Sequence, residues 1–120
     1  MSTRPRHLLV VERDRRVGSY VTQALRAEGY QVDWATGDED ALASVRRAPP
    51  ELILFDASRP DAGAVPLARA LRGDDPGVPM LLVTAGLSED DALGELAQAR
   101  LVKPFRLDDL LAQVAALLAR

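Results

Sequence analysis

The sequence predicts an α/β fold, a doubly wound parallel sheet of five strands with helices on both faces. Short apolar runs alternate with longer stretches whose apolar residues recur at helical spacing, and the alternation continues along all 120 residues. Such a pattern is typical of βα units, whose right-handed crossovers make the strands parallel. A chain of this length can bury one hydrophobic core, so we expect a single domain over 1–120 with its core in about 7–119.

The first half of the chain supplies two of these units. Residues 8–11 are a compact apolar run, which indicates a strand covered on both faces. The next stretch is a helix that ends near Gly29 and has an apolar side of Val17, Tyr20, Val21, Ala24 and Leu25. Residues 30–35 alternate as in a more exposed strand, on which we expect Trp34 to be a packed edge aromatic. A second helix stops at Pro49 and has an apolar side of Ala41, Leu42 and Val45.

The second half continues the alternation. Residues 52–55 are the third strand, and Pro66 stands near the start of a third helix with an apolar side of Leu67, Ala70 and Leu71. Residues 80–83 are the fourth strand, and a capping-box pattern at 88–91 opens a fourth helix. A short fifth strand at 101–102 precedes the last helix, which has the cleanest apolar stripe: Leu107, Leu110, Leu111, Val114, Leu117 and Leu118.

Composition excludes several kinds of function. Cysteine is absent, which excludes disulfides, thiol catalysis and zinc–thiolate sites. The only histidine, His7, is expected on the surface at the far end of the sheet. The net charge of −3 gives no basis for direct nucleic-acid binding. No run approaches the roughly 18 apolar residues of a membrane span, and no signal-peptide core follows the first arginines. We therefore expect a cytoplasmic protein that does not enter a membrane.

Four of the predicted strands are followed by polar residues that can form a site. Glu12 follows the first strand, Asp56 the third and Thr84 the fourth, while Lys103 follows the fifth. Ligands of doubly wound sheets bind outside the carboxyl ends of the strands. Two carboxylates, a hydroxyl and an ammonium at this edge indicate a phosphoryl-transfer pocket, because that chemistry depends mainly on positioning and charge neutralisation.

This set of residues, in this order, resembles the receiver domain of two-component response regulators. The resemblance extends over 8–118 and includes Pro60 four residues after Asp56, Thr84 followed by alanine, and Lys103 followed by proline. It implies a CheY-like, flavodoxin-like three-layer fold and a signalling protein, not an enzyme. It further implies that Asp56 accepts a phosphoryl group from a histidine kinase or other phosphodonor, that Lys103 and Thr84 contact the phosphate, and that an output domain or partner protein receives the signal.

The residues after the first strand depart from the family. The family has two adjacent acids there, and the second binds magnesium; here Glu12 is followed by Arg13, and Asp14 comes one place too late. Glu12, Asp56 and the backbone carbonyl of Ser58 would remain as Mg²⁺ ligands, but a guanidinium would oppose the metal. We hypothesise that Arg13 replaces the metal and pairs with Asp56; the alternative is that Arg13 turns into solvent and Asp14 contributes.

A second departure concerns the switch. The family couples its hydroxyl residue to an aromatic three places before the lysine, but that position is Arg100 here and no aromatic lies between Thr84 and Lys103. The resemblance implies a contact surface around the last helix and allows a homodimer through the fourth and fifth helices, although the segment before Lys103 is shortened.

Two functions remain open, with an enzyme as a third hypothesis. The chain is either a receiver whose Mg-dependent phosphorylation on Asp56 is impaired, or a pseudo-receiver that acts as a protein-interaction module without phosphorylation. A flavodoxin-like or phosphohydrolase activity has less support. No Gly- or Ser/Thr-rich phosphate loop follows the first strand, and the sequence after Asp56 lacks a second aspartate to act as general acid.

Overall fold

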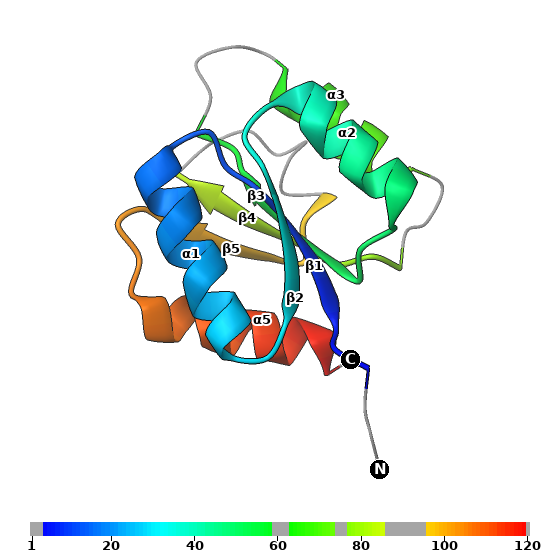
Figure 1. The fold of residues 1–120 in the computed structure, drawn as a ribbon. Coiled ribbons are helices and arrows are strands. Elements are labelled where there is room, and N and C mark those ends of the chain that lie inside the picture. The colour runs from blue at the N-terminus through cyan, green and yellow to red at the C-terminus, as the bar shows by residue number, and fades with distance from the viewer. Residues whose placement is uncertain (1–3, 59–62, 74–76, 86–95, 120) are drawn as a thin grey trace.

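The computed structural model describes residues 4–58, 63–73, 77–85 and 96–119, and contains one parallel sheet of five strands. The strand order is β2-β1-β3-β4-β5 (Figure 1), with bounds β1 His7–Val11, β2 Gln31–Ala35, β3 Leu52–Asp56, β4 Met80–Thr84 and β5 Ala99–Val102. The described helices are α1 Arg15–Ala27, α2 Asp38–Arg47, α3 Ala64–Arg72 and α5 Leu107–Leu118. The predicted doubly wound α/β fold with five parallel strands is confirmed.

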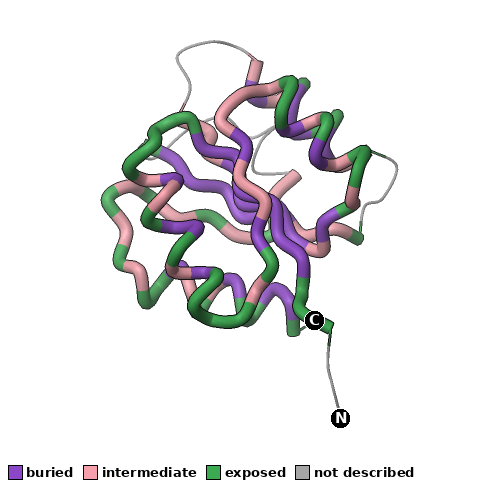
Figure 2. Tube along the Cα trace, viewed as in Figure 1, coloured by how far each residue is buried: buried purple, intermediate pink, exposed green. Residues whose placement is uncertain are grey.

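The sheet lies between two helical layers, α1 with α5 on one face and α2 with α3 on the other (Figure 1). Alternate residues of each central strand point to opposite faces, so β1 contributes Leu8 and Val10 to the first core and Leu9 and Val11 to the second. Figure 2 shows the central strands as the most continuous buried part of the molecule. The compact apolar runs in the sequence are therefore strands covered on both faces.

Local chemistry fixes both ends of α1. The carboxylate of Asp14 accepts hydrogen bonds from the backbone amides of Arg16 (2.9 Å) and Val17 (3.2 Å), which caps the helix N-terminus. Gly29 has φ of 97°, a left-handed conformation that suits glycine and reverses the chain after the helix. In the first turns of α1, a Cβ on Gly18 would lie 2.3 Å from the ring of Trp34. The absence of a side chain at Gly18 thus lets the β2 indole pack against this helix.

Three expectations for single residues were wrong. Ala70 was expected on the apolar side of α3, but it is exposed, because the buried side of that helix runs through Leu67, Ala68 and Leu71. Tyr20 was expected on the apolar side of α1, but it is 55% exposed, because the buried side of the helix runs through Gly18, Val21 and Leu25. His7 was expected on the surface, but it is buried as the first residue of β1, and its Nε2 lies 2.8 Å from Asp33 Oδ2. That partner on β2 compensates for burying a polar ring.

Several predicted elements can be assessed only in part. The fifth strand begins at Ala99, two residues earlier than predicted. The fourth helix predicted from 88–91 lies outside the described residues, as does Pro60. Within the described residues, no helix is long and apolar enough to cross a membrane.

Candidate functional site

The strand order brings the predicted site residues to one edge of the sheet. β1, β3 and β4 are neighbours, so Glu12, Asp56 and Thr84 come from adjacent strand ends. Thr84 is in register with Val102, the residue before Lys103. All four side chains predicted to form a site therefore share the carboxyl edge, as the sequence pattern indicated.

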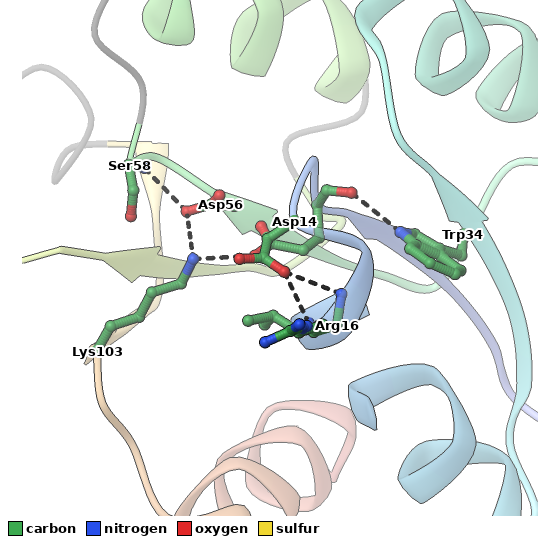
Figure 3. A network of polar contacts seen from close by, with 8 residues as sticks. Asp14, Arg16, Trp34, Asp56, Ser58 and Lys103 are labelled. Carbon is green, nitrogen blue, oxygen red and sulfur yellow. Dashed lines mark hydrogen bonds and ion pairs between the residues drawn. The ribbon is translucent and has the colours of Figure 1, made fainter. Parts of the chain in front are cut away.

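Lys103 connects the two carboxylates. Its Nζ lies 2.9 Å from Glu12 Oε1, a hydrogen bond, and 3.4 Å from Asp56 Oδ1. Figure 3 shows the Lys103 side chain and Ser58 both reaching the same end of the Asp56 side chain. The Ser58 amide donates to Asp56 Oδ1 at 2.9 Å. One carboxylate oxygen of Asp56 is thus held by a backbone amide and lies near an ammonium, which fixes its orientation.

The pKa values of the two carboxyl groups are shifted in opposite directions. Burial, and after it the neighbouring Asp56 carboxylate, raises the pKa of Glu12 to about 8, so Glu12 is mainly protonated at neutral pH. Burial also opposes the charge on Asp56, but the neighbouring Glu12, the hydrogen bond from the Ser58 amide and the charge of Lys103 outweigh it and lower the pKa of Asp56. For Lys103, burial is outweighed by its bond to Glu12 and the charge of Asp56, so its pKa is raised. The site therefore holds an aspartate–lysine ion pair beside a neutral carboxyl group.

Several buried oxygens at this edge have no hydrogen-bond partner in the described part of the chain: Glu12 Oε2, Ser58 Oγ and Thr84 Oγ1. Buried polar atoms are normally satisfied, and exceptions often mark places where water, an ion or a ligand binds. A hydroxyl such as Thr84 can donate to a phosphate oxygen. The edge therefore has unused hydrogen-bonding capacity beside the carboxylate of Asp56.

Arg13 does not make the predicted contact. Its guanidinium lies 3.2 Å from Asp38 Oδ1 at the start of α2, and its side chain is 49% exposed, so the hypothesis of an Arg13–Asp56 pair was wrong. A surface partner lets the guanidinium stay hydrated, whereas pairing with Asp56 would bury it at a desolvation cost. Of the alternative hypothesis, in which Arg13 turns into solvent and Asp14 joins the site, only the part about Arg13 is confirmed. Asp14 does not join the pocket, because its carboxylate caps α1.

Sequence reasoning missed how Trp34 and Glu12 are connected. The indole Nε1 donates to the backbone oxygen of Glu12 at 3.0 Å (Figure 3), so a β2 side chain supports the turn that holds the first carboxyl group. The alternating pattern of β2 placed Trp34 on a packed face, as predicted, but a hydrogen bond to a carbonyl leaves no signal in a sequence.

The β5 segment shows both agreement with the family pattern and departure from it. The Lys103–Pro104 peptide bond is cis, as the resemblance implied. Arg100, which occupies the position of the switch aromatic, is exposed on the edge strand β5. An aromatic switch of the usual kind is therefore absent from the sequence between Thr84 and Lys103.

The residues at this edge fit Mg²⁺ poorly. Magnesium requires an octahedron of oxygen ligands, usually with one or two ionised carboxylates. Burial raises the pKa of Glu12, so a metal ion would have to displace a proton there, and the ammonium of Lys103 lies against both carboxyl groups. Across the described residues, no group of three or more His, Asp or Glu side chains is placed to hold a metal ion. The carbonyl of Ser58, predicted as a further ligand, does not replace the missing acid at Arg13.

Comparisons with known proteins agree with this arrangement. Residues 8–115 match the response regulator receiver domain. The chain is 38% identical over 121 residues to the transcriptional regulatory protein PrrA of Mycobacterium tuberculosis (98% of this chain, 52% of PrrA). It is also 38% identical over 116 residues to the transcriptional regulatory protein CusR of Escherichia coli K12 (94% of this chain, 51% of CusR). The chain thus spans about half the length of these curated relatives.

A solved structure gives the same result for the fold. The crystal structure of a CheY-like response regulator receiver domain protein from Methanospirillum hungatei superposes with a TM-score of 0.87 at 28% sequence identity. The superposition covers 97% of this chain and 95% of that one.

Proposed function

The chain belongs to the response regulator receiver family, and on that premise we propose that Asp56 accepts a phosphoryl group and does so poorly. The donor would be a histidine kinase or a small phosphodonor. An oxygen of Asp56 attacks the phosphorus, the bond from phosphorus to the donor breaks, and an aspartyl phosphate results. The observation that carries this proposal is the position of the Lys103 ammonium, 3.4 Å from Asp56 Oδ1 and 2.9 Å from Glu12 Oε1.

Each neighbouring group has a role in this proposal. Lys103 neutralises the incoming phosphoryl oxygens as a point charge, and Thr84 donates its hydroxyl to one of them. The low pKa of Asp56 keeps it ionised and able to attack at neutral pH. No residue in this set would hydrolyse a phosphate ester repeatedly, so we propose a signalling role and not an enzymatic one.

We attribute the poor reactivity to Arg13, which replaces an acidic residue and therefore a negative charge. In the family an acid at this position binds magnesium, which neutralises the charge on the transferred group. Here the guanidinium is 49% exposed and paired with Asp38, so it contributes neither a metal ligand nor a cation at Asp56. Lys103 is then the single cation beside Asp56 among the described residues.

A pseudo-receiver is the second candidate, and a specific observation favours it. The Asp56–Lys103 pair and the protonated Glu12 already form a site without a metal or a phosphate. In that case the domain would act as a protein-interaction module. For either candidate we propose a single cytoplasmic domain that passes its signal to an output domain or partner protein. A homodimer through the fourth and fifth helices is one way in which it could do so.

The experiment is intact mass measurement after incubation with acetyl phosphate and MgCl₂. We expect a +80 Da adduct on at most a small fraction of the natural chain and on a much larger fraction of Arg13→Asp. Asp56→Asn and the double variant Arg13→Asp/Asp56→Asn should form no adduct. Arg15→Asp is the matched control, because it makes the same charge change at an exposed helix residue. Efficient labelling of the natural chain would overturn the proposed impairment. No label on either the natural chain or Arg13→Asp would leave the pseudo-receiver.

A further inference from the structure

A groove beside the candidate site shares Lys103 with it, but its other walls have no part in the chemistry proposed above. It lies where the first turns of α1 approach the loop entering α5 (Figure 1) and has a volume of about 600 Å³. Its walls come from three elements: Arg16, Val17 and Tyr20 on α1, Ala85 just after β4, and Lys103, Pro104 and Phe105 on the loop. Sites for small molecules usually have volumes of about 300–1,000 Å³, so this groove is large enough for one.

The walls of the groove are mainly apolar and aromatic. Tyr20 is 55% exposed, and Val102 is the only other exposed large hydrophobic residue in the described part of the chain. Phe105 is partly buried against the core between the sheet and α1 with α5. An exposed aromatic beside a fixed one is suited to a flat apolar group, because aromatic side chains bury a large area with few rotatable bonds.

The polar groups of the groove are cationic. Arg16 is exposed, and no side chain of the described residues bonds to its guanidinium, since nearby Asp14 accepts from backbone amides. Lys103 is shared with the carboxyl pair of the candidate site. Among the described residues that line the groove, none is acidic. Arg16 and Tyr20 are four residues apart on α1 and so lie on the same side of the helix.

We propose that this groove binds a small aromatic anion, in which a planar ring system packs on Tyr20 and Phe105 while a carboxylate or phosphate group meets Arg16 and Lys103. Arginine and lysine bind such anions by charge-assisted hydrogen bonds. The proposal goes beyond phosphoryl transfer to Asp56 and does not depend on it. Because Lys103 also bonds Glu12, a ligand here would compete for the same ammonium and so provide the site with an input other than phosphorylation.

The test is an NMR titration of the chain with phenyl phosphate, with inorganic phosphate and benzyl alcohol as its separate halves. We expect saturable amide shifts at Arg16, Tyr20 and Phe105 with phenyl phosphate, and at least about tenfold weaker binding of either half. Equal binding of phenyl phosphate and inorganic phosphate would mean anion binding at the lysine alone and would overturn the proposal. So would an absence of saturable shifts at these three residues.

Variants separate the groove from its surroundings. We expect Tyr20→Ala and Arg16→Gln each to weaken phenyl phosphate binding about tenfold, through loss of the aromatic wall or of a charge-assisted bond. Arg15→Gln changes an adjacent exposed arginine that does not line the groove, and should bind as the natural chain does. Equal affinities in all four proteins, with unchanged amide spectra elsewhere, would contradict the proposal.

The titration is repeated on Asp56→Asn without phosphodonor or magnesium. Binding retained there, whatever the mass experiment gives, supports the groove independently of phosphorylation. Loss of binding in Asp56→Asn would overturn the claim that the groove acts on its own.

Discussion

The two ends of the sheet both contain buried or partly buried polar groups, but they satisfy them differently. At the amino end, His7 Nε2 lies 2.8 Å from Asp33 Oδ2, and Glu51 pairs with both Arg4 (3.1 Å) and Arg6. Glu51 also accepts a hydrogen bond from the backbone amide of His7 at 3.2 Å. Each charged group there has a partner of opposite or complementary character within the chain.

At the carboxyl end the polar groups are less completely paired. Two carboxyl groups share one ammonium, and within the described chain Glu12 Oε2, Ser58 Oγ and Thr84 Oγ1 have no hydrogen-bond partner. Unsatisfied buried polar groups reduce stability. The difference indicates that the polar groups of the amino end stabilise the fold, whereas those of the carboxyl end keep hydrogen-bonding capacity for a group from outside the chain.

The largest effect that would test this contrast is the pH dependence that Glu12 gives to the free energy of unfolding. Its pKa is raised from 4.5 to about 8, so the native state holds a proton that the unfolded chain releases. The stabilisation from that proton is complete below the unfolded pKa and is lost as the pH rises through the folded pKa. Between those two values, the free energy of unfolding should fall by on the order of 4 kcal/mol in the natural chain and stay nearly flat in Glu12→Gln.

Urea unfolding at a series of pH values measures both slopes. Glu51→Gln is the matched control at the amino end: the pKa of Glu51 is lowered, so its contribution is lost only as the pH falls into the acid range. Above about pH 5, that control should show the slope of the natural chain. The same slope in Glu12→Gln would mean that Glu12 is not the group responsible.

A smaller effect should come from disturbing the support of the carboxyl end at Gly18. A methyl group there would lie 2.3 Å from the ring of Trp34, so Gly18→Ala should cost about 2 kcal/mol of unfolding free energy by overpacking. In a Trp34→Val background the cost should largely disappear, as a double-mutant cycle would detect. Gly37→Ala is the control, because no atom lies within 4 Å of its added methyl. An equal cost for Gly18→Ala in both backgrounds would exclude the indole as the cause.

The smallest effect is expected from the ion pairs of the amino end. Glu51 has a side chain 25% exposed, and Arg4 and Arg6 are 78% and 48% exposed, so solvent screens these pairs. Glu51→Gln should cost less than about 1 kcal/mol at neutral pH, and the difference should shrink in high salt. A larger, salt-independent loss in urea unfolding would show that this end depends on Glu51 for more than exposed ion pairs.

Most of the fold could be predicted because it depends on patterns that the sequence displays. The compact runs of β1, β3 and β4 are buried on both faces, and the apolar stripe of α5 packs on the sheet as expected. The end of α1 could be predicted from Gly29, because the chain adopts a left-handed conformation there and glycine is the residue that favours it. Periodicity failed for Tyr20, since helical spacing does not distinguish a residue facing the core from one facing a groove at its rim.

The composition of the site could be predicted, but its pairings could not. Strand-end positions brought Glu12, Asp56, Thr84 and Lys103 to one edge, because parallel strands end together. The prediction for Arg13 failed because a count of charges does not say which partner a flexible side chain reaches. Asp38, from the start of α2, offered a hydrated one. The roles proposed for these residues stay predictions until phosphorylation is measured.

Trp34 has one more consequence. It is the only tryptophan in the chain, and its indole nitrogen is bonded to the backbone oxygen of Glu12. The tryptophan fluorescence of the protein, excited at a wavelength that tyrosine does not absorb, therefore originates from a single ring bonded to the turn before the candidate site. A shift of its emission on adding a phosphodonor or an aromatic anion would give a label-free optical signal for events at that edge of the sheet.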